Sequence, residues 1–126
     1  HLILVDDVLT TGATLEACAN PLLEIPNTKV GNHLSGQLIR SGTSPALNYG
    51  EAQSGESRKD FIHKIKIVLK ELRESYNCLR IINKSRLYKS EEKVNKAIKE
   101  NNELIAIFVK SAETAQKNME KENRKS

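Results

Sequence analysis

Apolar residues recur at steps of three or four through the second half of the chain, which is the spacing of one face of an α-helix. The first such run follows Ser57, whose spacing to Asp60 matches a capping box at a helix start. The positions predicted to face the core are Phe61, Ile65, Val68, Leu72, Tyr76, Leu79 and Ile82. We therefore predict a long amphipathic helix beginning at Ser57 and ending near Asn83.

A second helical run follows a predicted turn at residues 83–88. Ser90 is a good N-cap, and Glu91 and Glu92 suit the positive end of the helix dipole. The predicted core positions are Val94, Ala97, Ile98, Asn101, Leu104, Ile105, Phe108, Ala112 and Ala115. The pattern then fades into polar sequence, and residues 119–126 are predicted to be a frayed polar tail.

The pattern is less regular over residues 32–54. Leu34 and Leu38 favour a helix, but Gly42 and Pro45 fall in its middle, so the local pattern alone predicts a broken helix. The polar residues near this interruption are Arg40, Ser41, Ser44, Asn48 and Glu51. We expect them to satisfy backbone groups freed by the interruption; the alternative is a polar binding site.

The chain starts with a different pattern. Four apolar residues, Leu2 to Val5, are typical of a buried parallel strand, and a loop of small residues leads to Thr14, which can cap a helix whose free N–H groups attract phosphate. The candidate phosphate-binding residues are Asp6, Asp7, Thr10, Thr11, Gly12, Ala13 and Thr14. Residues 2–19 resemble the phosphoribosyl-pyrophosphate (PRPP) motif of competence-type, type I phosphoribosyltransferases.

That resemblance implies that the acids hold the ribose hydroxyls and the loop holds the 5′-phosphate of PRPP, with Mg²⁺, in a complete transferase domain. The motif begins at the second residue and the chain begins with His1 rather than Met. Because such an enzyme needs most of its parallel sheet upstream, we expect a fragment or junction product whose motif is inert on its own. The alternatives are a transferase fragment, or residues 2–9 coiling into a helix that covers the rest.

A second resemblance covers residues 25–118. The matching segments are Gln37 to Ala52, Glu56 to Ser57, Lys59 to Lys66, Lys70 to Glu71 and Arg73 to Ser75. They resemble the bacterial four-helix bundle family, also called the 23S rRNA intervening-sequence protein family. The resemblance implies an all-α, up-and-down antiparallel bundle in which residues 32–54 form one kinked helix. It also implies a homo-oligomer, commonly a pentamer, with RNA or DNA as candidate partners.

Together these patterns predict three parts: a transferase-like strand-loop-helix remnant at residues 1–24, the bundle at 25–118 and the tail at 119–126. The residues that mark the junction, because they interrupt a continuous helix, are Pro21, Pro26, Asn27 and Gly31. Residues 13–24 leave room for about three helical turns in place of the family's long first helix, and Pro21 disrupts those turns.

Charge is distributed unevenly between the parts. Residues 1–55 hold two basic and five acidic residues, a net −3; because the whole chain carries +4, residues 56–126 carry +7. One face of the first predicted helix gathers a basic stripe: Lys59, His63, Lys66, Lys70, Arg73, Arg80 and Lys84. The stripe is a candidate contact for nucleic-acid phosphates; the alternative is an ordinary solvated helix face, partly paired with the acids Asp60, Glu71 and Glu74 to one side of it. Few aromatic residues argue against a dedicated single-strand binder.

The composition of the chain limits which kinds of protein and functional site it can form. A chain of 126 residues fits one domain with a modest core. Cys18 and Cys78 lack zinc-site spacing, which predicts no metal and a reduced, cytoplasmic environment. No apolar run reaches the roughly 20 residues of a membrane span. Because His33 and His63 have no nucleophile or acid at recognisable spacing, we predict no catalytic residues and no enzymatic activity.

Overall fold

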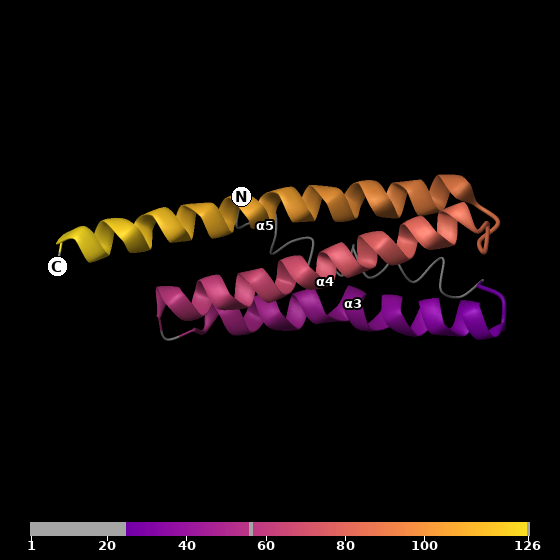
Figure 1. Cartoon of the computed structure of the whole chain (residues 1–126), viewed down its shortest axis with the longest axis horizontal. Helices are drawn as coiled ribbons and strands as arrows, with labels where there is room; N and C mark the ends of the chain where they lie inside the picture. The colour runs from indigo at the N-terminus through magenta and orange to yellow at the C-terminus, as the bar shows by residue number, and fades with distance from the viewer. Residues whose placement is uncertain (1–24, 56, 126) are drawn as a thin grey trace.

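The computed structural model describes residues 25–55 and 57–125 of the chain. This part consists of three helices: α3 (Lys29–Gln53), α4 (Arg58–Lys84) and α5 (Glu91–Lys125). The helices run up and down beside one another, joined by short turns at opposite ends of the bundle (Figure 1). α4 packs along its length against both α3 and α5.

The prediction of an all-helical fold is confirmed for the described residues, but its details are corrected. The described residues form three helices rather than four, and they contain no strand. The strand expected within residues 2–9 and the short helix expected within 13–24 lie outside the described residues.

The starts of α4 and α5 match the predicted caps. Ser57 Oγ accepts a hydrogen bond from the Asp60 amide at 3.1 Å, and Ser90 Oγ accepts one from the Lys93 amide at 3.3 Å. Each bond satisfies an N–H group that the first helical turn leaves without an internal partner. Between the two helices the chain turns through Arg86, whose φ of 54° lies in the left-handed region.

α3 is one helix from Lys29 to Gln53, as the family resemblance implied, and the break predicted from the local pattern is wrong. Pro45 lacks the N–H that would bond the Ser41 carbonyl, yet its ring is buried in the bundle. Asn48 Nδ2 donates to the Ser44 carbonyl at 3.0 Å, which supports the helix just past Pro45. Burial in the bundle therefore overrides the local preference for a break.

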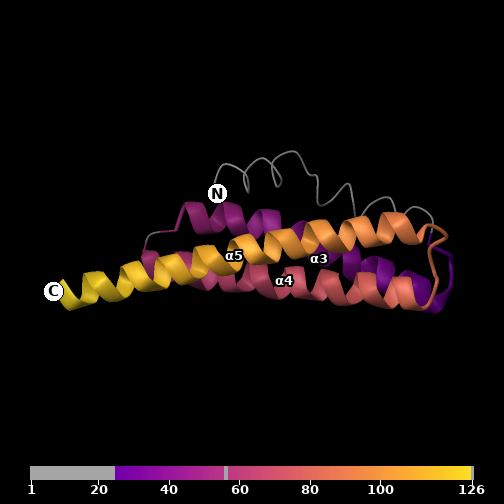
Figure 2. The same ribbon diagram turned by 90° about the horizontal axis from the view of Figure 1, so that it is seen from above.

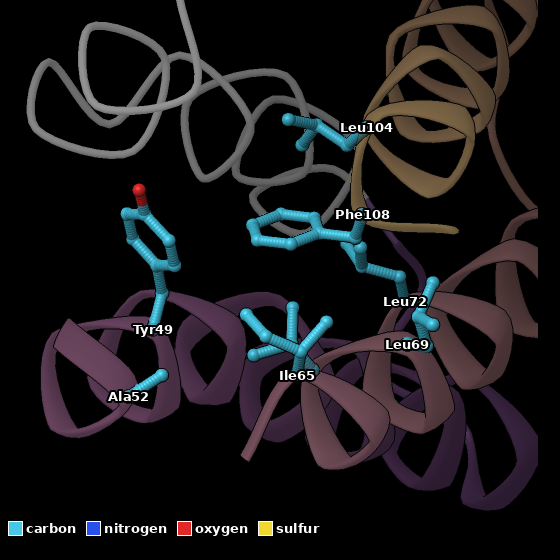
Figure 3. Packing of buried hydrophobic residues seen from close by; sticks show 8 residues of the cluster. Tyr49, Ala52, Ile65, Leu69, Leu72, Leu104 and Phe108 are labelled. Atoms are coloured by element: carbon cyan, nitrogen blue, oxygen red, sulfur yellow. The ribbon is translucent and has the colours of Figure 1, made fainter. Parts of the chain in front are cut away.

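The core is divided into two apolar clusters. The first, shown in Figure 3, contains Tyr49, Ala52, Ile65, Val68, Leu69, Leu72, Leu104 and Phe108. The second contains Leu34, Leu38, Cys78, Leu79, Ile82, Tyr88, Val94 and Ala97. Three fully buried polar residues, one from each helix, fall between the clusters in sequence: Ser41, Ser75 and Asn101. We call these three residues the polar layer.

The predicted core stripe of α4 is correct at its centre but too narrow. Phe61 and Tyr76 are only partly buried, whereas Ile62, Leu69 and Cys78 are buried without having been predicted. α4 lies against a helix on two sides, so its buried surface is wider than the single stripe expected from one packing partner.

α5 remains helical to Lys125, through residues predicted to fray. Its last turns consist largely of Glu, Lys, Gln and Arg, which are good helix formers. A hydrogen-bonded ion pair from Arg58 to Glu122, 2.6 Å long, also joins this end of α5 to the start of α4. The C-terminal end of α5 extends beyond the other two helices (Figure 2). The predicted division into three parts stays a prediction.

Candidate nucleic-acid interface

The outward face of α4 carries the predicted basic stripe. All seven residues of the stripe are exposed: Lys59, His63, Lys66, Lys70, Arg73, Arg80 and Lys84. Successive residues advance by about 100° around a helix, so these positions share one face, opposite the buried Val68 and Leu79. At about 1.5 Å per residue, the stripe runs for about 38 Å along α4.

No residue of the stripe forms an ion pair with a carboxylate within the described residues. The ion pairs there join Arg40 to Glu74, Arg58 to Glu122 and Lys64 to Glu51. None of them uses a stripe residue, although Glu74 and Lys64 are on α4 itself. Beside the stripe, the Glu74 carboxylate is directed toward Arg40 of α3 rather than toward a stripe residue.

One stripe residue is positioned by an aromatic ring. The Arg80 guanidinium lies 5.4 Å from the centre of the Tyr76 ring, within the range of a cation–π contact. This contact leaves the guanidinium hydrogen-bond donors at the surface of α4, where Arg80 is exposed. Arginine presents these donors in a planar fork that matches two oxygens of one phosphate.

The polar residues near Pro45 are engaged in structural contacts. Ser41 accepts a 2.8 Å hydrogen bond from Ser75, and Asn48 bonds both the carbonyl and the hydroxyl of Ser44. At the surface, Arg40 approaches Glu74 at 3.4 Å, and Glu51 pairs with Lys64. These contacts are structural, but only that of Asn48 involves a backbone carbonyl, so the expected role of satisfying backbone groups freed at Pro45 stays a prediction.

Cys78 is buried in the second cluster, and it is the free cysteine within the described residues. Burial raises the pKa of its thiol, the negative charge of Glu74 raises the pKa further, and Arg40 opposes both. A thiol that stays protonated is a poor nucleophile and a poor metal ligand. No group of three or more His, Cys, Asp or Glu side chains able to hold a metal forms among the residues described.

The candidate PRPP residues, Asp6 to Thr14, lie outside the described residues. Within the described part of the chain, no helix is long and apolar enough to cross a membrane.

Comparison with known families adds to this geometry. A family model described as 23S rRNA-intervening sequence protein matches residues 20–110 of the chain. The chain belongs to the 23S rRNA-intervening sequence protein family. The match includes α3, α4 and most of α5, with the whole basic stripe. No curated protein and no solved structure matches the chain significantly. The resemblance to phosphoribosyltransferases finds no support in these comparisons, and the family match begins beyond the PRPP motif.

A pocket between the three helices was missed by the sequence patterns. Its volume is about 350 Å³, and its walls come from the end of α3, the start of α4 and the middle of α5. Tyr49, Phe61 and Phe108 line it. These residues are far apart in sequence, and the helical spacing predicts Phe61 and Phe108 only as core positions of separate helices. The sequence held one signal for the pocket: the chain's two phenylalanines, Phe61 and Phe108, both fall at core-facing positions, on different helices.

Proposed function

We propose that the protein is a non-enzymatic helical bundle that binds the phosphates of structured RNA through the basic stripe of α4. The observation that carries the proposal is the row of exposed basic side chains along one face of α4, none of them in an ion pair within the described residues. Lysine and arginine bind phosphates without reading sequence, and counterion release makes this binding strongly salt-dependent.

The family description supports RNA as the nucleic acid, because it associates the family with the intervening sequence of 23S rRNA. A row of charges about 38 Å long suits the regularly spaced phosphates of a folded RNA helix. Between Arg73 and Arg80, Asn77 adds an exposed group that both donates and accepts hydrogen bonds.

We also propose that the protein is a homo-oligomer, with the pentamer of the family resemblance as the specific expectation. The outer face of α3 exposes large apolar side chains: Ile39 is 51% exposed and Leu47 is 70% exposed. Ala46 and Gly50 lie on the same outward side of the helix. Burying this surface against another copy removes it from water, and closed symmetry is the usual form of such assemblies.

The RNA proposal is tested by fluorescence anisotropy with a labelled RNA hairpin over a series of salt concentrations. Reversal of Lys66, Lys70 and Arg73 to Glu should weaken binding by more than about tenfold and reduce the salt slope by about two to three. The matched control reverses Lys96, Lys99 and Lys117, which are exposed on α5 and give the same change in net charge.

The control should retain most of the affinity. Equal losses in both variants would show that overall charge, and not the stripe, drives binding. Unchanged affinity after reversal of the three stripe residues would contradict the proposal.

A further inference from the structure

We propose that the pocket between α3, α4 and α5 receives one unpaired nucleotide of the bound RNA, with its base against the apolar floor and its phosphate at the basic rim. The inference rests on the proposed RNA-binding function and adds a second contact to the stripe. The volume of about 350 Å³ is near the lower end of ligand pockets, which suits a single nucleotide.

The floor of the pocket concentrates the few aromatic rings of this protein. The chain has five aromatic residues, two Phe and three Tyr, and Phe61, Phe108 and Tyr49 line the pocket. Tyr49 and Phe108 meet edge to face, with ring centres 5.4 Å apart, and form the buried base of the site (Figure 3). Phe61 is only partly buried, so its ring offers surface for a base to pack against.

One wall adds hydrogen-bonding groups in a row. Ser111, Thr114 and Asn118 line the pocket from α5, where their spacing of three and four residues places them along one side of the helix. Within the described residues, none of these side chains makes a hydrogen bond to another protein group. A nucleobase edge has donors and acceptors that use such groups, whereas an alkyl chain has none. The wall therefore favours a heterocyclic ring over a fatty acid.

The rim supplies positive charge at two points. Lys110 and Arg58 line the pocket from α5 and α4. Arg58 is bound to Glu122 through two hydrogen bonds, 2.6 and 3.3 Å long, and the Glu122 side chain is 59% exposed. The pair is exposed to water, so a phosphate of the RNA competes with the Glu122 carboxylate for the same guanidinium donors. Glu122 is then expected to oppose binding of the nucleotide, and neutralising its carboxylate should raise the affinity for the nucleotide.

The lining of the pocket includes a residue next to the start of the stripe. Arg58 precedes Lys59, the first stripe residue, and lies about 100° from it around α4. An RNA helix lying along the stripe with an unpaired nucleotide near its end thus has a pocket close to its backbone. This placement favours a nucleotide of the same RNA over a free mononucleotide.

The test compares a fully paired hairpin with the same hairpin carrying one bulged 2-aminopurine. We expect the bulged RNA to bind about tenfold more tightly, since one base against aromatic side chains adds that order of affinity. The fluorescence of the 2-aminopurine should fall on binding. Phe61→Leu, which keeps apolar volume but removes the ring, and Lys110→Glu should each abolish the preference, while Glu122→Gln should increase it. Equal binding of the two hairpins would overturn the proposal.

Failure of the pocket and failure of the stripe are distinguishable. Reversal of Lys66, Lys70 and Arg73 should weaken both hairpins equally and leave the ratio between them unchanged. Adenosine 5′-monophosphate, added at millimolar concentration without RNA, should shift the amide NMR signals of Ser111 and Thr114 in both the native and the stripe-reversed protein. Shifts caused instead by hexanoate, with none from the nucleotide, would overturn the assigned ligand class.

Discussion

Ser75 of α4 donates a 2.8 Å hydrogen bond to Ser41 of α3, and both hydroxyl groups are fully buried between the helices. Removing one hydroxyl leaves the other buried without a hydrogen-bond partner, whereas removing both hydroxyls leaves no unsatisfied polar group. We expect Ser41→Ala and Ser75→Ala each to lower the free energy of unfolding by about 1–2 kcal/mol. The double variant should lose less than the sum. Additive losses in urea denaturation would show that the bond does not couple the two residues.

Gly31 and Gly36 should respond in opposite directions to the same substitution. A Cβ at Gly31 would lie 2.3 Å from the Pro26 carbonyl oxygen, whereas one at Gly36 would have no atom within 4 Å. We expect Gly31→Ala to destabilise the protein by about 1–3 kcal/mol through this clash. Gly36→Ala should stabilise it by about 0.5–1 kcal/mol because alanine is the better helix former. Thermal unfolding of the two variants measures both effects, and a stable Gly31→Ala protein would contradict the observed close approach.

The Cys78 thiol should be unreactive in the folded protein and should make stability fall at alkaline pH. Burial raises its folded-state pKa, so the unfolded state loses the thiol proton first. Stability from this group is therefore full below the unfolded pKa of about 8.5 and declines above it, by at most about 1.4 kcal/mol per pH unit. A Cys18→Ser background isolates Cys78, and a disulfide reagent measures its reactivity with and without urea. Replacement by Ala should remove this part of the pH dependence; rapid labelling of the folded protein would contradict burial.

The exposed apolar side chains of α3 should control self-association. We expect the Ile39→Ser/Leu47→Ser double variant to have a lower mass in light scattering than the native protein, because less apolar surface is buried on assembly. Ile81→Ser is the matched control, since Ile81 is 49% exposed but lies on α4. An oligomer that persists in the double variant and dissociates in the control would place the interface on α4 instead.

The local features of the fold were predictable from sequence. Ser57 and Ser90 cap their helices as expected, because an N-cap depends on residues within one turn. The stripe was found in the same way, since an exposed face follows from helical spacing alone. Continuation of α3 through Pro45 was not predictable from local pattern, because burial in the bundle decides it.

Features that depend on several helices were also missed. Leu69 is buried because α4 has two neighbours, which the spacing along α4 cannot reveal. The pocket requires Tyr49, Phe61 and Phe108 to meet from three helices, and nothing within any one helix indicates that meeting. Sequence patterns therefore supplied the elements and the charged surface, while the pocket followed only from their packing.

The polar layer has a consequence for how the helices are aligned along their length. Contacts between apolar side chains are not directional. Two apolar helix faces can therefore shift past each other by one helical turn, about 5.4 Å, and still bury similar surface. A slide of α5 past α4 would carry Asn101 away from the Leu72 carbonyl, to which its amide now donates at 2.8 Å. The shift would bury that amide among aliphatic side chains without a hydrogen-bond acceptor. The free-energy cost of the unsatisfied amide would not be offset by any gain in apolar contact. The three buried polar residues thus specify one alignment of the helices. Other alignments would bury a similar apolar area but would leave polar groups without hydrogen bonds.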